Sequence, residues 1–356
     1  MFEELLEAWD GEQVAVRYDR QLRTWMFVCV HSTRLGPGAG GTRMKVYPSP
    51  HDGLRDGLRL SAAMTSKNTM AGLPLGGGKA VLAVPEVPEG DRRREVLLAY
   101  ADLVESLHGT YWTACDMNTT PQDMDAIAER CGSVFGRSEA GGGSGSSAPA
   151  TAIGVFHGIQ ACAREVFGTP DLGRRTVLVQ GVGAVGRVLA ERLHEAGAEL
   201  ILADADPARA EHAAGRLGAR TVPAESAIDT PCDVFSPCAT GAVLSEETIP
   251  RLRCRIVAGA ANNQLARSED AERFRPLGIL YAPDYVINAG GIIHLASLEL
   301  LGEDLAARDE RVLAIGDTLT ELFRRAEEQG LSTTAAADEV VAARLAAGGG
   351  TRLAPA

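Results

Sequence analysis

The sequence lacks the features of a membrane, secreted or nucleic-acid-binding protein. No run of 18 apolar residues occurs, and the first twelve residues, MFEELLEAWDGE, are acidic and contain no hydrophobic signal core. We therefore expect neither a membrane span nor secretion. The net charge of −12 provides no basic surface for nucleic acid. These absences favour a cytoplasmic protein with no membrane or nucleic-acid partner.

Cysteine and histidine are few and scattered. The seven cysteines, an odd number, include no C-x-x-C pair, which is typical of reduced thiols and not of a disulfide framework. The seven histidines show no H-E-x-x-H or other close ligand spacing. We expect no metal site.

Glycine is plentiful, with 40 residues in 356, and one glycine-rich stretch contains candidate chemistry. This stretch runs from Met64 to Val81, MTSKNTMAGLPLGGGKAV, and holds Lys67 and Lys79. Three consecutive glycines precede Lys79. A glycine triplet lets the backbone approach a ligand and presents the side chain that follows. Lys79 is therefore a candidate catalytic residue.

This stretch has two other possible interpretations, a phosphate-binding P-loop and a flexible turn. A phosphate-binding P-loop, G-x-x-x-x-G-K-[ST], requires Gly at 73 and a hydroxyl at 80. The sequence has Leu73 and Ala80 there, so the P-loop fails at two fixed positions. The other interpretation is a flexible turn before a strand at 80–84, with Lys79 merely solvated.

The surrounding segments predict an α/β domain. Residues 14–19 and 24–31 alternate in polarity and flank a polar break, which indicates a β-hairpin. Residues 35–44, LGPGAGGTRM, are rich in glycine and read alone as a flexible loop. Amphipathic helices are predicted at 52–64 and 92–107.

Asp116 lies in the segment YWTACDMNTTPQDMD. Thr120 followed by Pro121 predicts the start of a helix. Asp116 therefore falls at a strand end or in the loop before this helix, where catalytic groups are often held. A lone aspartate in such a loop is more often a helix cap or a solvated charge.

The most specific motif is that of a dinucleotide-binding fold. A buried strand at 176–180 leads into GVGAVG, a helix follows, and a second strand at 199–203 ends at Asp204. This order of elements predicts a Rossmann unit whose glycines let the backbone approach a pyrophosphate. Asp204 is placed to bind the ribose hydroxyls and to repel a 2′-phosphate, so NAD is expected over NADP. The motif contributes Gly181, Val182, Gly183, Ala184, Val185 and Gly186.

These motifs together resemble the glutamate/leucine/phenylalanine/valine dehydrogenase family, which oxidatively deaminates L-amino acids. The resemblance rests on the two-lysine stretch, on a T-x-x-D-x-x-T pattern around Asp116, on the dinucleotide motif and on YAPDYVINAGGIIHL at 281–295, which occur in family order. The C-terminal segments IHLASLELLG and AIGDTLTELF are most similar to those of actinobacterial phenylalanine dehydrogenases.

The resemblance implies an α/β fold of two domains with an active-site cleft between them. The first, at 1–140, is a substrate and oligomerisation domain, on which the C-terminal helices at 330–356 would pack. The second, at 145–328, is a Rossmann NAD-binding domain. A Gly/Ser-rich segment at 136–150 marks the boundary. The resemblance also implies a homo-oligomer and a small-molecule substrate.

The resemblance further assigns roles to individual residues. Lys67 would bind the substrate carboxylate, Lys79 would be catalytic, and Asp116 would transfer protons to and from the amino group. The substrate-binding set would be completed by Ala39, Gly40, Gly41, Ala114, Asn262, Ile292 and Leu295. Besides the glycine motif and Asp204, the cofactor-binding set would comprise Thr151, Ala239, Thr240, Ala260, Asn262 and Asn288.

The sequence departs from the family pattern at a few positions. These are Ser66, Cys115 beside Asp116, and Thr240 in place of an apolar residue. None of them removes a catalytic group. Ser146 and Ser147 stand where many members have an Asp- or Asn-Pro-Ser-Pro sequence, so which serine contacts cofactor stays open.

The pocket residues predict an apolar L-amino acid, because Ala39, Ala114, Ile292 and Leu295 offer no cation to a second carboxylate. The wider resemblance favours a phenylalanine-like substrate, with the branched-chain substrates leucine, isoleucine and valine as the alternative. Two other classes were considered. A non-catalytic NAD-binding protein would be expected to lose Lys67, Lys79 and Asp116, and a hydroxy acid dehydrogenase usually needs a histidine at the hydride site.

Overall fold

The computed structural model describes residues 2–239 and 241–348, and these form two compact units. The first contains the described residues up to Gly145, Leu295–Asp304 and the described residues from Val341. The second contains Ser146–His294 and Leu305–Val340. The C-terminal helix α11 (Thr333–Ala347) is thus divided between them. Of the predicted C-terminal segment 330–356, residues 349–356 lie outside the described part of the chain.

The first unit is built on a five-stranded sheet of order β1-β2-β4-β3-β5. β1 and β2 form the predicted antiparallel hairpin, and β2 is also antiparallel to β4. β3 is parallel to both β4 and β5. The bounds are β1 Gln13–Asp19, β2 Thr24–Ser32, β3 Gly38–Lys45, β4 Gly76–Ala83 and β5 Tyr111–Cys115.

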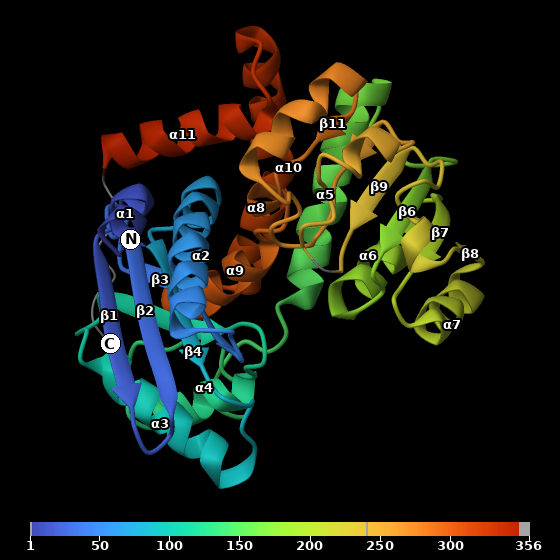
Figure 1. The fold of residues 1–356 in the computed structure, drawn as a ribbon. Coiled ribbons are helices and arrows are strands. Elements are labelled where there is room, and N and C mark those ends of the chain that lie inside the picture. The colour runs from blue at the N-terminus through green and yellow to red at the C-terminus, as the bar shows by residue number, and fades with distance from the viewer. Residues whose placement is uncertain (1, 240, 349–356) are drawn as a thin grey trace. The chain divides into compact units, whose positions relative to one another are not determined.

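Helices cover both faces of this sheet (Figure 1). α2 lies across one face, over a core that includes Phe27, Leu58 and Val81. α3 and α4 cover the other face, over a core that includes Met26 and Tyr100. The bounds are α1 Phe2–Trp9, α2 Pro50–Met70, α3 Gly90–Glu105 and α4 Pro121–Ala128.

Two segments of this unit differ from their sequence predictions. The stretch 35–44 is not a loop over most of its length, because its residues from Gly38 onward form the buried strand β3. The glycine triplet is likewise inside a strand, since β4 begins at Gly76 and every residue of it is buried. A Cβ on Gly77 would lie 2.6 Å from the Ser61 carbonyl oxygen of α2. The glycines therefore allow α2 to pack closely on the sheet.

The second unit contains a six-stranded parallel sheet of order β11-β10-β9-β6-β7-β8. β6 and β7 have the predicted bounds, Thr176–Gln180 and Glu199–Ala203. The other strands are β8 Arg220–Thr221, β9 Val234–Pro237, β10 Ile256–Val257 and β11 Leu280–Tyr281. The chain leaves β6 toward β7 on one side and later returns to β9 on its other side, so the strand order reverses at β6. Such a reversal is where α/β sheets bind ligands.

Within this unit α5 packs against α6 and α10. The helices are α5 Ala148–Phe167, α6 Ala184–Glu195, α7 Pro207–Leu217, α8 Asp284–Ile287, α9 Gly290–Leu295 and α10 Leu305–Gln329. Short 3₁₀ turns lie at Ala224–Ser226, Ile249–Arg251, Ser268–Arg273 and Arg275–Leu277, and a π-helical turn of the first unit at Ala296–Leu300. None of the helices in the described residues is both long and apolar enough to span a bilayer.

We predict that Gly77→Ala destabilises the first unit. The added methyl group would collide with Thr65 and Ser61 of α2, and overpacking of this kind costs about 1–3 kcal/mol or more. Gly215→Ala is the control, since this exposed helical glycine has nothing within 4 Å of an added Cβ and should gain roughly 0.5–1 kcal/mol. Urea unfolding measures both changes. Equal stabilities of Gly77→Ala and wild type would contradict the close packing of α2 on β4.

Candidate active site and dinucleotide site

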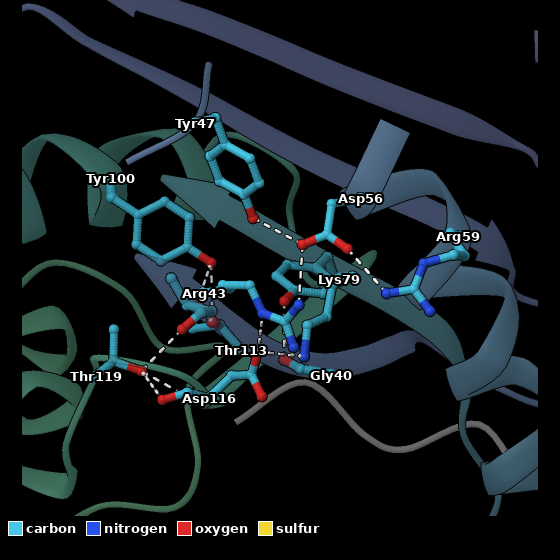
Figure 2. Close-up of polar contacts among 12 residues, drawn as sticks. Gly40, Arg43, Tyr47, Asp56, Arg59, Lys79, Tyr100, Thr113, Asp116 and Thr119 are labelled. Carbon is cyan, nitrogen blue, oxygen red and sulfur yellow. Dashed lines mark hydrogen bonds and ion pairs between the residues drawn. The ribbon is translucent and has the colours of Figure 1, made fainter. Parts of the chain in front are cut away.

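Lys79 and Asp116, predicted separately from the sequence, form an ion pair inside the first unit. Lys79 Nζ lies 3.0 Å from Asp116 Oδ2 (Figure 2). The lysine side chain is 7% exposed and the aspartate side chain 22%. Lys79 stands near the middle of β4, and Asp116 directly follows β5. The interpretation of Lys79 as a solvated side chain is therefore wrong.

The strand register explains why these groups meet on the α2 side of the sheet. Cys29 is paired with Lys79 across β2 and β4, and its sulfur lies 3.0 Å from where a Cβ on Gly57 of α2 would stand. Because side chains alternate along a strand, Lys79 shares the α2 face with Cys29. Gly41 lies in the middle of β3, paired with Ala114 of β5, and a Cβ there would be 2.8 Å from Asp116 Cβ. The absence of a side chain at Gly41 lets Asp116 approach.

The loop that holds Asp116 is fixed by its backbone. The Asp116 N–H donates to Thr119 Oγ1, and Thr119 in turn donates to the Thr42 carbonyl of β3. Thr120 and Asp123 form a capping box at the start of α4, which satisfies two free N–H groups of the helix. The predicted helix start at Thr120 is confirmed, and it holds the loop between β5 and α4 in one conformation.

Burial and mutual charge shift both members of the pair. Burial lowers the pKa of Lys79, Asp116 opposes this shift, and the positive charge of Arg43 adds to it. Burial alone would raise the pKa of Asp116, but Lys79 and Arg43 outweigh it and hold that pKa at about 2. The carboxylate is therefore ionised at neutral pH, and the ammonium loses its proton more readily than an exposed lysine would.

Three further residues surround this pair and were missed in the sequence. Arg43 of β3 donates from Nε to Asp116 Oδ2 at 2.8 Å and from NH1 to Asp56 Oδ2 of α2 at 2.9 Å. Tyr47 donates to the same Asp56 oxygen at 2.7 Å. The available signal was the position of Arg43 two residues beyond Gly41 on one strand, but it requires that 35–44 be recognised as a strand.

The other expected substrate residues of the first unit have the following places. Lys67 lies in the last turn of α2. Gly40 accepts a hydrogen bond from the Tyr111 hydroxyl, and Ala39 accepts one from Asn68. The register places Ala39 on the Lys79 side of the sheet, because it is paired with Gly77.

Ala114 and Leu295 lie together beside Gly136. A Cβ on Gly136 would be 3.5 Å from Ala114 Cβ and 3.5 Å from Leu295 Cδ1. Glu299 holds the adjoining loop, because its carboxylate accepts from the N–H groups of Gly136 and Ser144. The first unit thus presents a small apolar surface with a fixed backbone.

In the second unit the predicted glycine motif connects β6 to α6. Gly181 has φ of 100°, in the region that favours glycine, and an added Cβ would be 2.7 Å from Ala239 Cβ. Gly183 precedes α6 and has nothing within 4 Å of an added Cβ. The backbone is tightly packed at Gly181 and has free space at Gly183, which fits a pyrophosphate at the helix N-terminus.

Asp204 is buried, directly follows β7 and contacts this turn. Its Oδ2 accepts from the Val182 N–H at 2.8 Å, and its Oδ1 accepts from the Asp206 N–H at 2.9 Å. Arg209 NH1 lies 3.3 Å from Oδ1. Asp204 therefore supports the glycine turn.

The remaining predicted cofactor residues follow the carboxyl ends of the neighbouring strands or begin helices beside them. Asn288 donates to the carbonyls of Ala260 and Ala261 and to Asn262 Oδ1, while its own buried Oδ1 has no hydrogen-bond partner among the described residues. An orphaned acceptor of this kind fits an amide-bearing ligand. Thr151 lies in the first turn of α5, Ala239 follows β9 and Ala260 follows β10, whereas Thr240 is outside the described residues. Ile292, an expected substrate residue, lies in α9.

The donor sets do not suggest a metal. Among the described residues, no group of three His, Cys, Asp or Glu side chains is arranged to hold a metal ion. The seven cysteines are free, and burial raises the pKa of Cys115 to about 12. The chemistry available in the first unit is therefore a buried amine beside a carboxylate.

The sequence was compared with known protein families and relatives. A family model described as "Glu/Leu/Phe/Val dehydrogenase, dimerisation domain" matches residues 14–132, and one described as "Glutamate/Leucine/Phenylalanine/Valine dehydrogenase" matches 142–207 and 205–347. The chain is 42% identical to leucine dehydrogenase of Thermoactinomyces intermedius, covering 96% of this chain and 92% of that one. It is 41% identical to valine dehydrogenase of Streptomyces albus, covering 94% and 92%.

Solved structures give the same result. L-tryptophan dehydrogenase from Nostoc punctiforme superimposes with a TM-score of 0.83 at 36% identity, covering 98% of this chain and 99% of that one. The family models together span most of the chain, and the relatives share it almost end to end. The chain belongs to the Glu/Leu/Phe/Val dehydrogenase family and is an amino acid dehydrogenase, an oxidoreductase that acts on a CH–NH2 group.

Proposed function

We propose that this enzyme uses NAD⁺ to deaminate branched-chain L-amino acids of the leucine and valine type. The balanced reaction is L-amino acid, NAD⁺ and water to 2-oxo acid, NADH and ammonium, and it is reversible. The buried Lys79–Asp116 pair carries the proposal, in a chain 41–42% identical to leucine and valine dehydrogenases. These relatives favour the branched-chain alternative over the phenylalanine-like substrate expected from the C-terminal segments.

We also propose a homo-oligomer formed through the dimerisation domain, which light scattering after size exclusion would detect.

The proposed roles of Lys67 and Lys79 come from the family resemblance, and the charges in the first unit support that of Lys79. Lys67 binds the substrate carboxylate. A bound nicotinamide supplies the hydride acceptor for the Cα hydrogen. Lys79 then takes a proton from the water that attacks the substrate imine, which requires the neutral amine. The lowered pKa of Lys79, caused chiefly by burial, makes that form more available.

The acidity of Asp116 refines its expected role. With a pKa of about 2, Asp116 holds almost no proton at neutral pH, so it is poorly suited to store one between steps. A carboxylate in this position attracts a substrate ammonium and stabilises a protonated Lys79. Proton transfer through Asp116 is therefore transient, and Lys79 is the group that retains the proton.

We expect Lys79→Ala to abolish turnover and to leave NADH binding nearly intact. The lysine acts on water and imine, whereas the dinucleotide motif lies in the second unit. Turnover is measured as absorbance at 340 nm with leucine and NAD⁺, and binding by NADH fluorescence. Lys45→Ala, at an exposed lysine of β3, is the control and should stay active. Rates near wild type in Lys79→Ala would refute the proposed mechanism.

We expect NAD⁺ to be preferred over NADP⁺ because the Asp204 carboxylate would repel a 2′-phosphate. Asp204→Asn keeps an acceptor for the Val182 N–H and removes the charge. The ratio of kcat/KM for NAD⁺ to that for NADP⁺ should therefore narrow, by about tenfold for roughly 1.4 kcal/mol of lost repulsion. If the wild type uses NAD⁺ and NADP⁺ equally well, Asp204 does not select the cofactor. Arg209 should then be tested as the residue that binds the 2′-phosphate of NADP⁺.

The substrate prediction rests on the apolar surface formed by Ala114 and Leu295. Leu295→Ala leaves more room beside Ala114, so kcat/KM for valine should fall. The ratio of kcat/KM for phenylalanine to that for valine should rise, by a factor equivalent to about 1–3 kcal/mol of discrimination. Leu313→Ala, at an exposed leucine of α10, should change neither. The assay uses leucine, isoleucine, valine, phenylalanine and tryptophan. An unchanged ratio in Leu295→Ala would exclude Leu295 from the pocket, and a wild-type preference for an aromatic substrate would overturn the branched-chain proposal.

A further inference from the structure

Arg43 connects the Lys79–Asp116 pair to helix α2. Its guanidinium contacts Asp116 Oδ2 at 2.8 Å on one side and Asp56 Oδ2 at 2.9 Å on the other. Figure 2 shows this group between the two carboxylates, with the Lys79 ammonium next to Asp116 as well. The Arg43 side chain is only 14% exposed. Arg43 is thus a partly buried arginine with two carboxylate partners, one of which also binds Lys79.

The two cations share a single oxygen of Asp116. Lys79 Nζ and Arg43 Nε both lie within 3.0 Å of Oδ2. Oδ1 receives no hydrogen bond from any residue that the structure describes. Because the planar guanidinium has a fixed donor geometry, Arg43 can bind Asp116 and Asp56 together only in a narrow range of orientations, which holds Asp116 Oδ2 in place. The oxygen left over, Oδ1, is the one available to a substrate amine.

Asp56 and Tyr47 hold the guanidinium in turn. Tyr47 donates to Asp56 Oδ2 at 2.7 Å, and Arg59 donates to Asp56 Oδ1 at 3.0 Å. The Asp56 side chain is 15% exposed. Both Asp56 oxygens are thus engaged, and Arg43 has little freedom to move away from Asp116.

We propose that Arg43 is a positioning residue for the reaction: held by Asp56, it fixes Asp116 beside Lys79 and keeps the lysine ready to take a proton. This inference rests on the proposed roles of Lys79 and Asp116. Arg43 contacts neither substrate nor cofactor in this account, and it acts only through Asp116.

The charges around Lys79 support the direction of this effect. The loop after β5 contributes Asp116, β3 contributes Arg43, and α2 contributes Asp56. Opposite Lys79 on β2 stands Cys29, whose pKa burial raises to about 12, so this thiol is neutral. Burial lowers the pKa of Lys79 most, Asp116 raises it, the Arg43 charge lowers it further, and the Asp56 charge raises it.

Removing the two charges should therefore shift activity in opposite directions. The acid limb of the kcat/KM profile reports the ionisation of a base in the free enzyme, which we assign to Lys79. Arg43→Gln should move this limb to higher pH by about one unit, since a cation is lost beside the lysine. Asp56→Asn should move it to lower pH. Arg43→Lys keeps the positive charge but lacks the planar guanidinium that bridges Asp116 and Asp56. The acid limb should therefore stay at the wild-type pH, while kcat falls roughly 10- to 100-fold.

Arg93→Gln is the matched control. Arg93 is also a partly buried arginine, with two hydrogen bonds to Asp123 and one to the Asn118 carbonyl in the loop that follows Asp116. Its loss should lower thermal stability, but it should leave the acid limb in place. If Arg93→Gln moves the limb as far as Arg43→Gln does, loosening of the loop explains the shift and the proposal fails.

The remaining outcomes separate this inference from the proposed function. If the wild type deaminates no amino acid, or Lys79→Ala keeps its activity, the function or the role of Lys79 is at fault. If Lys79→Ala is inactive but the acid limbs of Arg43→Gln and Asp56→Asn coincide with that of wild type, only the inference about Arg43 is overturned. Shifts of the two variants in the same direction would overturn it as well.

Discussion

One oxygen atom, Oδ2 of Asp116, accepts from both Lys79 and Arg43, and the first unit depends on this contact. A buried cation is tolerated only when it is paired, and removing one partner of such a pair commonly costs several kcal/mol. Here two cations and two carboxylates, Asp116 and Asp56, balance one another within a few ångströms. The balance explains how a lysine can stand in the middle of a fully buried strand.

The glycines of β3 and β4 make this arrangement sterically possible. Gly77 lets α2 lie close enough for Asp56 to meet Arg43, and Gly41 leaves room for Asp116 beside the middle of β3. Larger residues would move the helix or the loop by an ångström or more, enough to break contacts of 2.8–3.0 Å. The glycine content of this stretch is thus a packing requirement that serves the electrostatic one.

Local patterns in the sequence were sufficient for part of this structure. The strand, turn, helix and strand around Gly181, and the helix start at Thr120, are each decided by neighbouring residues, and their positions were predicted correctly. The set of Arg43, Asp56 and Tyr47 was not found. Its members come from a strand, a helix and the segment between them, and their meeting depends on strand register. Glycine-rich β3 also has almost no strand propensity, so its pairing with β4 and β5, and not its composition, makes it a strand.

Each unit places an arginine beside a carboxylate to which we assign a proposed role, and the different environments decide what each arginine can do. Arg209 lies 3.3 Å from Asp204, but its side chain is 54% exposed. Water and salt screen that pair, so it contributes little and the arginine can turn away at low cost. Arg43 is shielded from solvent and held at both ends, so its charge acts on Asp116 and Lys79 with far less screening. At the proposed cofactor site, the exposed Arg209 can adjust to a ligand, whereas at the proposed proton-transfer site the charge of Arg43 stays in place.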